Sequence, residues 1–182
     1  MGAADEQRLI SEAQRGNRDA FRTLVERYMK QAYNIAFGYV KNHDDAADVA
    51  QESFVRVHRA LRSFHGDAEF GTWLYRIVAN LSLNRMKKNA RISRREVRLE
   101  ESLHLAGNIP QDEYKTDRHE LLERALHELP TLQRATVILR HLNGFSTRQV
   151  SGILRCSEGT VKTHLHRGLK KLRLRLEFLN NE

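Results

Sequence analysis

The chain has 182 residues, of which 40% are hydrophobic and 30% are charged, and 31 Lys and Arg against 23 Asp and Glu give a net charge of +8. No apolar run approaches the roughly 20 residues of a membrane span, and the start lacks a basic-then-apolar export signal, so we expect a cytoplasmic protein without membrane insertion. Two prolines and no alternating valine- or threonine-rich runs predict an all-α fold, while the positive excess favours an anionic partner.

Hydrophobic residues recur at helical spacing through residues 1–90, which we interpret as a first domain of four helices. The expected helices cover residues 5–15, 18–40, 44–61 and 72–88. Between the last two, the sequence SFHGDAEFGT contains two glycines and several polar residues, which predict a loop.

Three carboxylates, those of Asp44, Asp48 and Glu52, are spaced four residues apart on the predicted helix 44–61. This spacing places them on one face, which would repel DNA. The face therefore meets either a positively charged protein surface or solvent. Metal binding beside His43 is a weaker interpretation, because the carboxylates spread along about 12 Å of helix. We predict no metal site.

The segment FHGDAEFGTWLYRIVANLSLNRMKK combines aromatic side chains with amides and cations. An unpaired nucleic-acid strand needs such a combination, because unstacked bases must be stacked again and their edges hydrogen-bonded. Aromatic residues more often pack a core, and we expect this of Trp73 and Tyr75. The loop residues and Asn80 are the better candidates for base contact.

The helical pattern lapses after residue 90, and Gly107, Asn108 and Pro110 break any continuous helix, so residues 91–116 are predicted to form an extended linker. A second domain, residues 117–182, follows with expected helices over residues 117–128 and 132–142. The two small helical domains are thus predicted to be joined only by this linker.

Residues 146–175, STRQVSGILRCSEGTVKTHLHRGLKKLRLR, predict a short helix, a tight turn and a longer basic helix that Ser157 caps. An apolar stripe of the second helix is formed by Val161, Leu165, Leu169, Leu172 and Leu176. Between Arg155 and Leu176 there are seven Lys or Arg residues and one acidic residue. A solvated surface helix would explain the charge alone, but cap, turn and stripe together favour a helix-turn-helix that binds DNA.

Catalytic motifs are missing from the sequence. We find no phosphate-binding GxxxxGK[ST] loop and no nucleophile–base pair, and therefore expect no cofactor and no enzyme activity. A zinc set of His141, His164, His166 and Cys156 is disfavoured, because these residues lie on the DNA-facing element. Cys156 is the only cysteine, which excludes an internal disulfide, and we interpret it as a turn residue rather than a redox sensor.

Three segments together resemble the extracytoplasmic-function (ECF) sigma factors, small specificity subunits of bacterial RNA polymerase. They are DDAADVAQESFVRVHRAL (44–61), FHGDAEFGTWLYRIVANLSLNRMKK (64–88) and LPTLQRATVILRHLNGFSTRQVSGILRCSEGTVKTHLHRGLKKLR (129–173). The helix-turn-helix alone would also suit response-regulator effector domains. The resemblance implies a four-helix sigma domain 2 (1–90), a linker (91–116) that threads toward the polymerase active centre, and a four-helix sigma domain 4 (117–182).

The same resemblance implies a promoter-specific initiation factor that binds the polymerase core and is controlled by an anti-sigma factor. The implied polymerase contacts are the flap region of the second-largest subunit and the clamp helices of the largest subunit. Residues implied to contact the clamp helices are Asp45, Asp48, Gln51, Glu52 and Phe54.

For promoter DNA, the resemblance implies capture of a flipped base of the melted −10 strand, with Asn80 in the reading position. The implied −10 residues are Phe64, Phe70, Arg76, Asn80, Arg85, Lys87 and Lys88, and the implied −35 residues are Ser157, Thr160, Lys162, Thr163, His166, Arg167 and Lys170. His164 and His166 depart from the residues that the family more often has there, which leaves the −35 preference open.

Two other functions remain as alternatives. An autonomous helix-turn-helix regulator would bind its operator tightly without polymerase. A metal-dependent nuclease would use the carboxylates near Asp44 and would lose activity when Asp44 or Asp48 is replaced.

Overall fold

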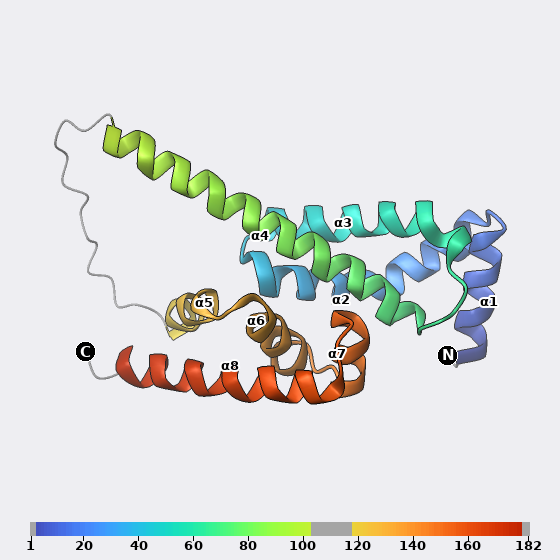
Figure 1. Ribbon diagram of the computed structural model, residues 1–182. Coiled ribbons are helices and arrows are strands. Elements are labelled where there is room, and N and C mark those ends of the chain that lie inside the picture. Colours follow the sequence, from blue (N-terminus) through green and yellow to red (C-terminus); the bar gives the residue numbers. More distant parts are fainter. Residues whose placement is uncertain (1–2, 103–117, 180–182) are drawn as a thin grey trace.

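The computed structural model describes residues 3–102 and 118–179, and every regular element in these ranges is a helix. Helices α1 to α4 form one group, and α5 to α8 form a second group that lies below it in Figure 1. The all-α fold expected from the sequence is confirmed. The first group consists of α1 (Ala3–Gln14), α2 (Arg18–Val40), α3 (His43–Ala60), a short 3₁₀ turn η1 (Leu61–Ser63) and α4 (Phe70–Ser102).

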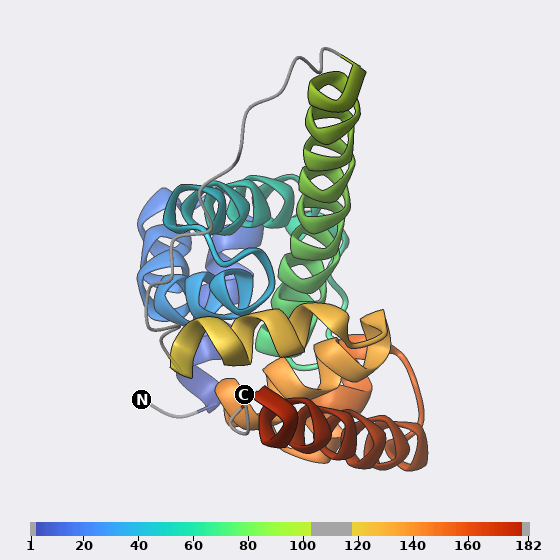
Figure 2. The same cartoon turned by 90° about the vertical axis from the view of Figure 1, so that its left-hand side faces the viewer.

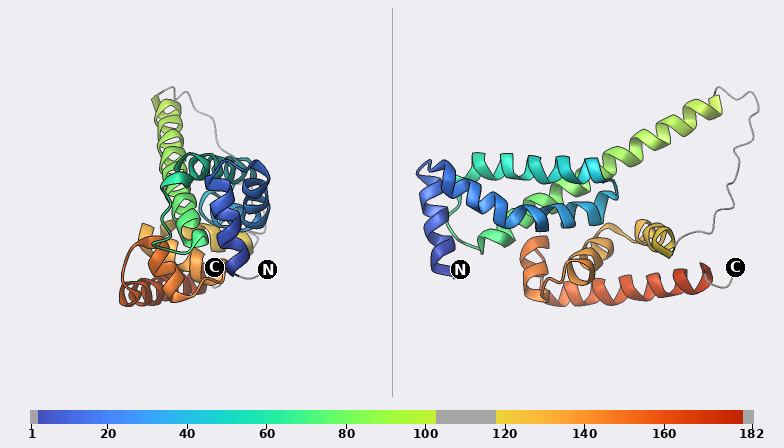
Figure 3. Two further views of the ribbon diagram at one scale, coloured as in Figure 1. Left: turned by 90° about the vertical axis from the view of Figure 1, so that its right-hand side faces the viewer. Right: turned by 180° about the vertical axis from the view of Figure 1, so that it is seen from behind.

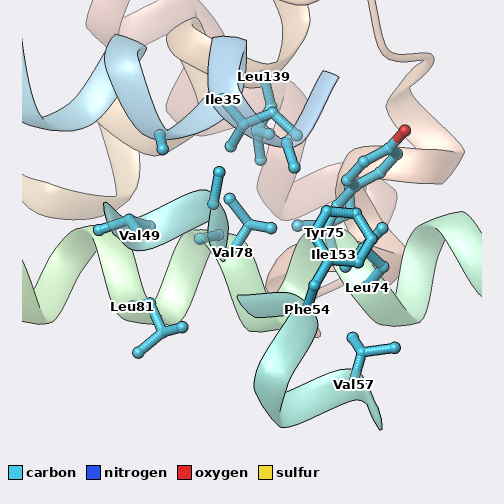
Figure 4. Packing of buried hydrophobic residues seen from close by; sticks show 14 of the residues in the cluster. Ile35, Val49, Phe54, Val57, Leu74, Tyr75, Val78, Leu81, Leu139 and Ile153 are labelled. Carbon is cyan, nitrogen blue, oxygen red and sulfur yellow. The ribbon is translucent and has the colours of Figure 1, made fainter. Parts of the chain in front are cut away.

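The first group is built around α2, α3 and α4, which pack against one another, while α1 covers α2. Their shared core is formed by fully buried aliphatic side chains, several of which converge in Figure 4: Leu24, Ile35, Val49, Val57, Leu74 and Val78. Each of these residues lies on the apolar stripe of its helix, so burial of the stripes holds the group together.

The turn between α2 and α3 consists of two residues. Lys41 ends α2 in the left-handed conformation (φ 57°), and the Asn42 side chain accepts a hydrogen bond from the Asp45 backbone N–H at 2.9 Å. This cap pairs an otherwise unsatisfied donor at the start of α3. The tight turn places α3 antiparallel beside α2 (Figure 1), with Asp44 and Asp48 of its first turns exposed and Asp45 partly buried.

Helix α4 is longer than predicted. It extends from Phe70 to Ser102, and its C-terminal half projects beyond α2 and α3 in Figure 1. The expected end near Lys88, and an extended linker from residue 91 onward, are therefore wrong over residues 91–102. No glycine or proline occurs between Gly71 and Gly107, so nothing in this stretch stops a helix. The remainder of the predicted linker, residues 103–116, lies outside the described residues.

The second group contains α5 (Arg118–Glu128), α6 (Thr131–Val137), the π-helical turn η2 (Ile138–Leu142), α7 (Thr147–Leu154) and α8 (Glu158–Leu179). The predicted helix over residues 132–142 is thus an α-helix that changes to π-helical winding. In this turn the Asn143 backbone N–H donates to the Ile138 carbonyl five residues earlier, at 3.0 Å. Helix α8 packs against α5, α6 and α7.

Helices α7 and α8 form the predicted helix-turn-helix. Ser146 and Gln149 make a reciprocal capping box at the start of α7, and Arg155 ends that helix in the left-handed conformation (φ 53°). The Ser157 hydroxyl then accepts from the Thr160 backbone N–H at 3.0 Å, as the sequence predicts. Val161 and Leu172 of the apolar stripe are buried, but Leu169 is 38% exposed, so the stripe is narrower than expected.

The two helical groups pack directly against each other. Helix α7 lies against α4 and η2 lies against α2, and Leu139 and Ile153 of the second group share one core with Ile35 and Leu74 of the first (Figure 4). Helix α8 is on the side of the second group that faces away from α1 to α4 (Figures 2 and 3). The sequence predicted two domains but gave no indication of this contact.

Candidate nucleic-acid interface

The acidic face of α3 divides into a partly buried residue, Asp45, and an exposed part. Asp45 accepts hydrogen bonds from Arg85 and from Asn89, the latter at 2.6 Å, and both donors belong to α4. These bonds, that of Asn89 first and that of Arg85 next, keep the pKa of Asp45 below its usual value. Asp45 therefore attaches α3 to α4, and its carboxylate is already occupied.

Asp48 and Glu52 form the exposed part of this face. The Asp48 side chain is 65% exposed and lies 3.5 Å from Arg85, whereas Glu52 pairs with Arg56 one turn along the helix at 2.6 Å. The Glu52–Arg56 pair lies within one helix and is exposed, and the Asp48–Arg85 pair is long and leaves Asp48 largely exposed, so both pairs contribute little to stability. Both carboxylates can therefore meet a positively charged surface.

Next to this face, α2 and α3 enclose a groove of about 450 Å³ whose lining includes Phe21, Met29, Gln51 and Val55. Phe54 is only 5% exposed and packs in the core, so its predicted contact with a partner is limited to the floor of this groove. Val55, which is 48% exposed, is the apolar side chain that this helical turn presents to solvent. The sequence prediction missed it because Val55 lies off the apolar stripe.

The aromatic residues between α3 and α4 pack against one another. The Phe64 ring lies 4.9 Å from Trp73 and 5.8 Å from Phe70, centroid to centroid. Phe70 is the first residue of α4 rather than a loop residue, and it is 2% exposed. Its side chain is thus not available to a base, contrary to its assignment among the −10 residues. Tyr75 is buried as expected, while Phe64 and Trp73 remain partly exposed.

Asn80 and four cations follow the aromatic cluster along α4. Asn80, Lys87 and Lys88 are exposed, and the first and last lie two helical turns apart. Arg76 is only partly exposed and donates to the backbone carbonyl of Gly152 in α7 at 2.8 Å. Arg85 is held by Asp45. The structure therefore presents Asn80 and the two lysines to solvent, and engages both predicted arginines elsewhere.

Helix α8 has an exposed basic face. Its exposed residues include Lys162, Thr163, His166, Arg167 and Lys170, all of them predicted −35 residues. Ser157 and Thr160 instead hydrogen-bond each other at 2.8 Å and cap the helix, which makes them positioning residues for this face. In the described part of the chain, no group of three His, Cys, Asp or Glu residues could hold a metal ion.

Two families match the parts of the chain just described. Sigma-70 region 2 matches residues 24–92, which span α2, α3 and most of α4, and Sigma-70, region 4 matches residues 119–172. The ECF RNA polymerase sigma factor SigW of Bacillus subtilis (strain 168) is 30% identical over 93% of this chain and 96% of the relative. The chain belongs to the ECF sigma factors. The resemblance noted in the sequence is thereby confirmed.

Other relatives of this sigma factor match it over a similar length. The ECF RNA polymerase sigma-E factor of Haemophilus influenzae is 31% identical over 96% of both chains. The solved structure of CnrH in complex with the cytosolic domain of CnrY has a TM-score of 0.70 and 25% identity, and covers 95% of this chain and 97% of that chain. The high coverage means that both helical groups have counterparts in one solved chain.

No described helix of the sigma factor is both long and apolar enough to span a membrane.

The sequence identified exposed residues on α3, α4 and α8, but it missed two hydrogen-bond partners from elsewhere in the chain. Asn89 binds Asp45, and the Gly152 carbonyl binds Arg76. The sequence gave neither residue a role of its own, so only the packing of the helices reveals these two contacts.

Replacing Asp45 with Asn should lower the melting temperature at pH 7, because it removes the carboxylate that Asn89 and Arg85 bind. The pKa of Asp45 is lower in the folded chain than in the unfolded chain. Its carboxylate therefore stabilises the fold above the unfolded-state pKa of about 3.9, and this stabilisation is lost as the pH falls through the folded-state pKa. The difference between D45N and wild type in thermal melts should shrink below about pH 4.

The matched control is D44N, because Asp44 is exposed in the same first turn of α3. Both variants lose a charge near the helix N-terminus, so any excess loss in D45N reports the contact with α4. Equal melting temperatures of the two variants at pH 7 would contradict the proposed role of Asp45.

Proposed function

We propose that this sigma factor brings RNA polymerase core to two-part promoters and helps open them by trapping unstacked bases, without catalysing a reaction itself. The observation that carries the proposal is the separation of two charged surfaces. The exposed carboxylates Asp48 and Glu52 lie on α3, and the basic face of α8 lies on the opposite side of the chain (Figures 1 and 3). Each surface would repel the partner of the other.

The α3 surface would bind the clamp helices of the largest polymerase subunit. Asp48, Glu52 and Gln51 are exposed there, beside the apolar groove in which Val55 is accessible. The groove is lined mainly by apolar side chains, with His58 and Arg59 at one part of its lining. Together with the exposed carboxylates beside it, this surface suits a helix that carries aliphatic and basic residues. The coupling of Asp45 to α4 would hold this surface rigid against the rest of the domain.

The α4 surface would hold the −10 strand. Asn80 offers an amide that can both donate to and accept from a base edge, and Lys87 and Lys88 follow it along the exposed part of α4. Phe64 and Trp73, partly exposed beside the start of α4, supply aromatic surface for an unstacked base. Arg76 and Arg85 would contribute to phosphate binding only after leaving their present partners.

The α8 surface would contact the −35 element in the major groove. Lys162, His166 and Arg167 are exposed on α8, the second helix of the helix-turn-helix, as in a recognition helix. On the other side of α8, Leu129, Lys171 and Leu174 line a groove of about 320 Å³ between α5 and α8. Ala125, Leu129 and Leu174 give this groove an apolar surface, which Glu128, Lys171 and Arg175 also line, and it would receive the flap region of the second-largest subunit.

Control by an anti-sigma factor and a cytoplasmic location complete the proposal. The sigma factor RpoE has been solved in complex with the anti-sigma factor NepR from Bartonella quintana, and it has a similar fold. The TM-score is 0.63 at 24% identity, and the match covers 86% of this chain and 96% of that chain. Membership of the ECF family supports the same mode of control here. A protein that occupies the α3 surface would exclude the polymerase.

Reversing the charge of the exposed carboxylates tests the polymerase contact. We expect D48K/E52K to bind core polymerase at least about tenfold more weakly, because two attractive contacts become repulsive. The control is D19K, which reverses an exposed carboxylate at the start of α2, away from the groove. Pull-down and titration against purified core would measure the affinities, with circular dichroism as a check of folding. Unchanged binding by D48K/E52K would reject the contact.

Replacing Asn80 with Ala tests base capture. On a promoter identified by run-off transcription, N80A holoenzyme should form open complexes about tenfold less efficiently, as expected for the loss of a base-edge contact. Its binding to core polymerase should not change. The control is N34A, since Asn34 is an exposed amide on α2. Permanganate reactivity of unpaired thymines would report opening, and wild-type opening by N80A would exclude Asn80 from this role.

Replacing Arg167 with Ala tests the −35 contact through its salt dependence. The loss of one phosphate or base contact should weaken promoter binding by the holoenzyme and reduce the slope of log affinity against log salt concentration by about 1. The control is R62A, which removes an exposed arginine from η1. Filter binding at several salt concentrations would measure the slope, and identical slopes for R167A and wild type would count against the contact.

A further inference from the structure

Gln14 connects the last turn of α1 to the loop that precedes α4. Its side-chain Nε2 donates to the backbone carbonyl of Leu61 at 3.0 Å and to that of Phe64 at 2.8 Å, 47 and 50 residues further along the chain. One side-chain amide carries two N–H donors, so both bonds form at once. The loop lies beside α1 in Figures 1 and 3, and these two bonds fix its beginning to that helix.

The helix that carries Gln14 is itself held in place. Leu9 and Ile10 of α1 are buried, with 7% and 3% exposure, and Glu6 accepts a hydrogen bond from Arg27 of α2 at 3.1 Å. Gly16, at φ 95°, adopts a left-handed conformation that favours glycine and turns the chain from α1 into α2. Gln14 therefore lies on a fixed backbone, and its bonds restrain the loop rather than the helix.

The loop between α3 and α4 has two fixed ends and an exposed middle. At its start the Phe64 carbonyl accepts from Gln14, and at its end the Glu69 carbonyl accepts from the Trp73 backbone N–H at 3.0 Å. Between these points, residues 65–67 are exposed. A loop that is ordered at both ends loses less conformational entropy when it binds a partner. The bond from Gln14 thus sets the position of Phe64 and leaves the middle of the loop accessible.

Phe64 is part of the proposed −10 surface. Its ring lies 4.9 Å from that of Trp73, and both residues are partly exposed. Trp73 and Asn80 are about two helical turns apart on one face of α4, and both line a pocket of about 340 Å³. Gln14 reaches this surface through the backbone of Phe64, because its own bonds are to main-chain carbonyls.

We propose that Gln14 is a positioning residue for capture of the −10 strand: its amide holds Phe64 in place, so that the rings of Phe64 and Trp73 form a preorganised surface before an unpaired base arrives. The proposal rests on the −10 role of α4 given above. A base that stacks on a preformed aromatic surface does not have to order the loop first, which favours binding. Helix α1 thus acts in promoter opening through the loop.

A purely structural role for Gln14 makes a different prediction. Loss of its bonds would then lower the melting temperature alone, whereas a positioning role also changes the contact between Phe64 and Trp73. Trp73 is the single tryptophan of the chain, so its fluorescence reports that contact directly.

Replacing Gln14 tests its hold on the loop. Q14E keeps the length of the side chain, but an ionised carboxylate has no donor for the carbonyls of Leu61 and Phe64. Q14A removes the same bonds without adding a charge. In both variants we expect a red-shifted Trp73 emission and stronger quenching by acrylamide, because Phe64 no longer covers the indole ring. The control is Q7E, since Gln7 is an exposed glutamine on the same helix.

The same variants test the effect on promoter opening. At a promoter identified by run-off transcription, holoenzyme with Q14E or Q14A should form about fivefold fewer open complexes, as expected for the loss of hydrogen bonds of ordinary strength. Permanganate reactivity would measure opening, and the affinity for core polymerase should equal that of wild type. Combining Q14A with F64A should give no larger defect than F64A alone, since residue 14 acts through Phe64.

Wild-type Trp73 fluorescence in both Q14E and Q14A would overturn the proposal, and so would wild-type opening by both variants or additive defects of Q14A and F64A. If Q14E does not fold in thermal melts, Q14A decides. Normal opening by N80A and F64A would instead reject the −10 role of α4, and a changed Trp73 spectrum would then still show that Gln14 positions the loop.

Discussion

The geometry of α4 is the constraint on which the other contacts depend. An α-helix returns to the same face every three to four residues, and each face of α4 has a different neighbour. Leu74 and Val78 enter the core, Arg85 holds Asp45 of α3, and Arg76 holds Gly152 of α7. Asn80 lies on α4 between Arg76 and Arg85 in sequence, and its side chain is exposed. Because one rigid helix positions all of them, a change in the packing of one neighbour affects the presentation of the others.

Helical spacing and turn residues predicted most of this fold. The helix-turn-helix, its serine caps and the acidic face of α3 follow from local sequence, since caps and amphipathic stripes are local properties. The burial of Phe70 could not be read in the same way, because an aromatic residue beside a loop has no local indicator of what covers it. The docking of the second helical group on the first depends on two glycines that are far in sequence from the residues they approach. Gly38 packs against Ile138, and Gly152 packs against Thr72.

Opposite charges on opposite sides explain how a net-basic chain can have two kinds of macromolecular partner. The exposed carboxylates of α3 are kept away from α8 by the width of both helical groups (Figure 2). Asp45, although part of the same acidic face, is neutralised within the chain by Arg85. Sequence spacing treated Asp45 and Asp48 alike, whereas the structure holds Asp45 in an internal ion pair and leaves the Asp48 side chain 65% exposed.

The π-helical turn η2 affects how this chain tolerates a change in its length. Its five residues, Ile138–Leu142, are closed by a hydrogen bond that spans five residues instead of the four of an α-helix, and they directly precede the helix-turn-helix. A π-helical turn accommodates one more residue than an α-helical turn, so deleting one residue there would restore regular winding. Ile138 and Leu139 of this turn are fully buried, and Ile138 packs against Gly38. The turn should therefore tolerate the loss of one residue more readily than a change in the size of these two side chains.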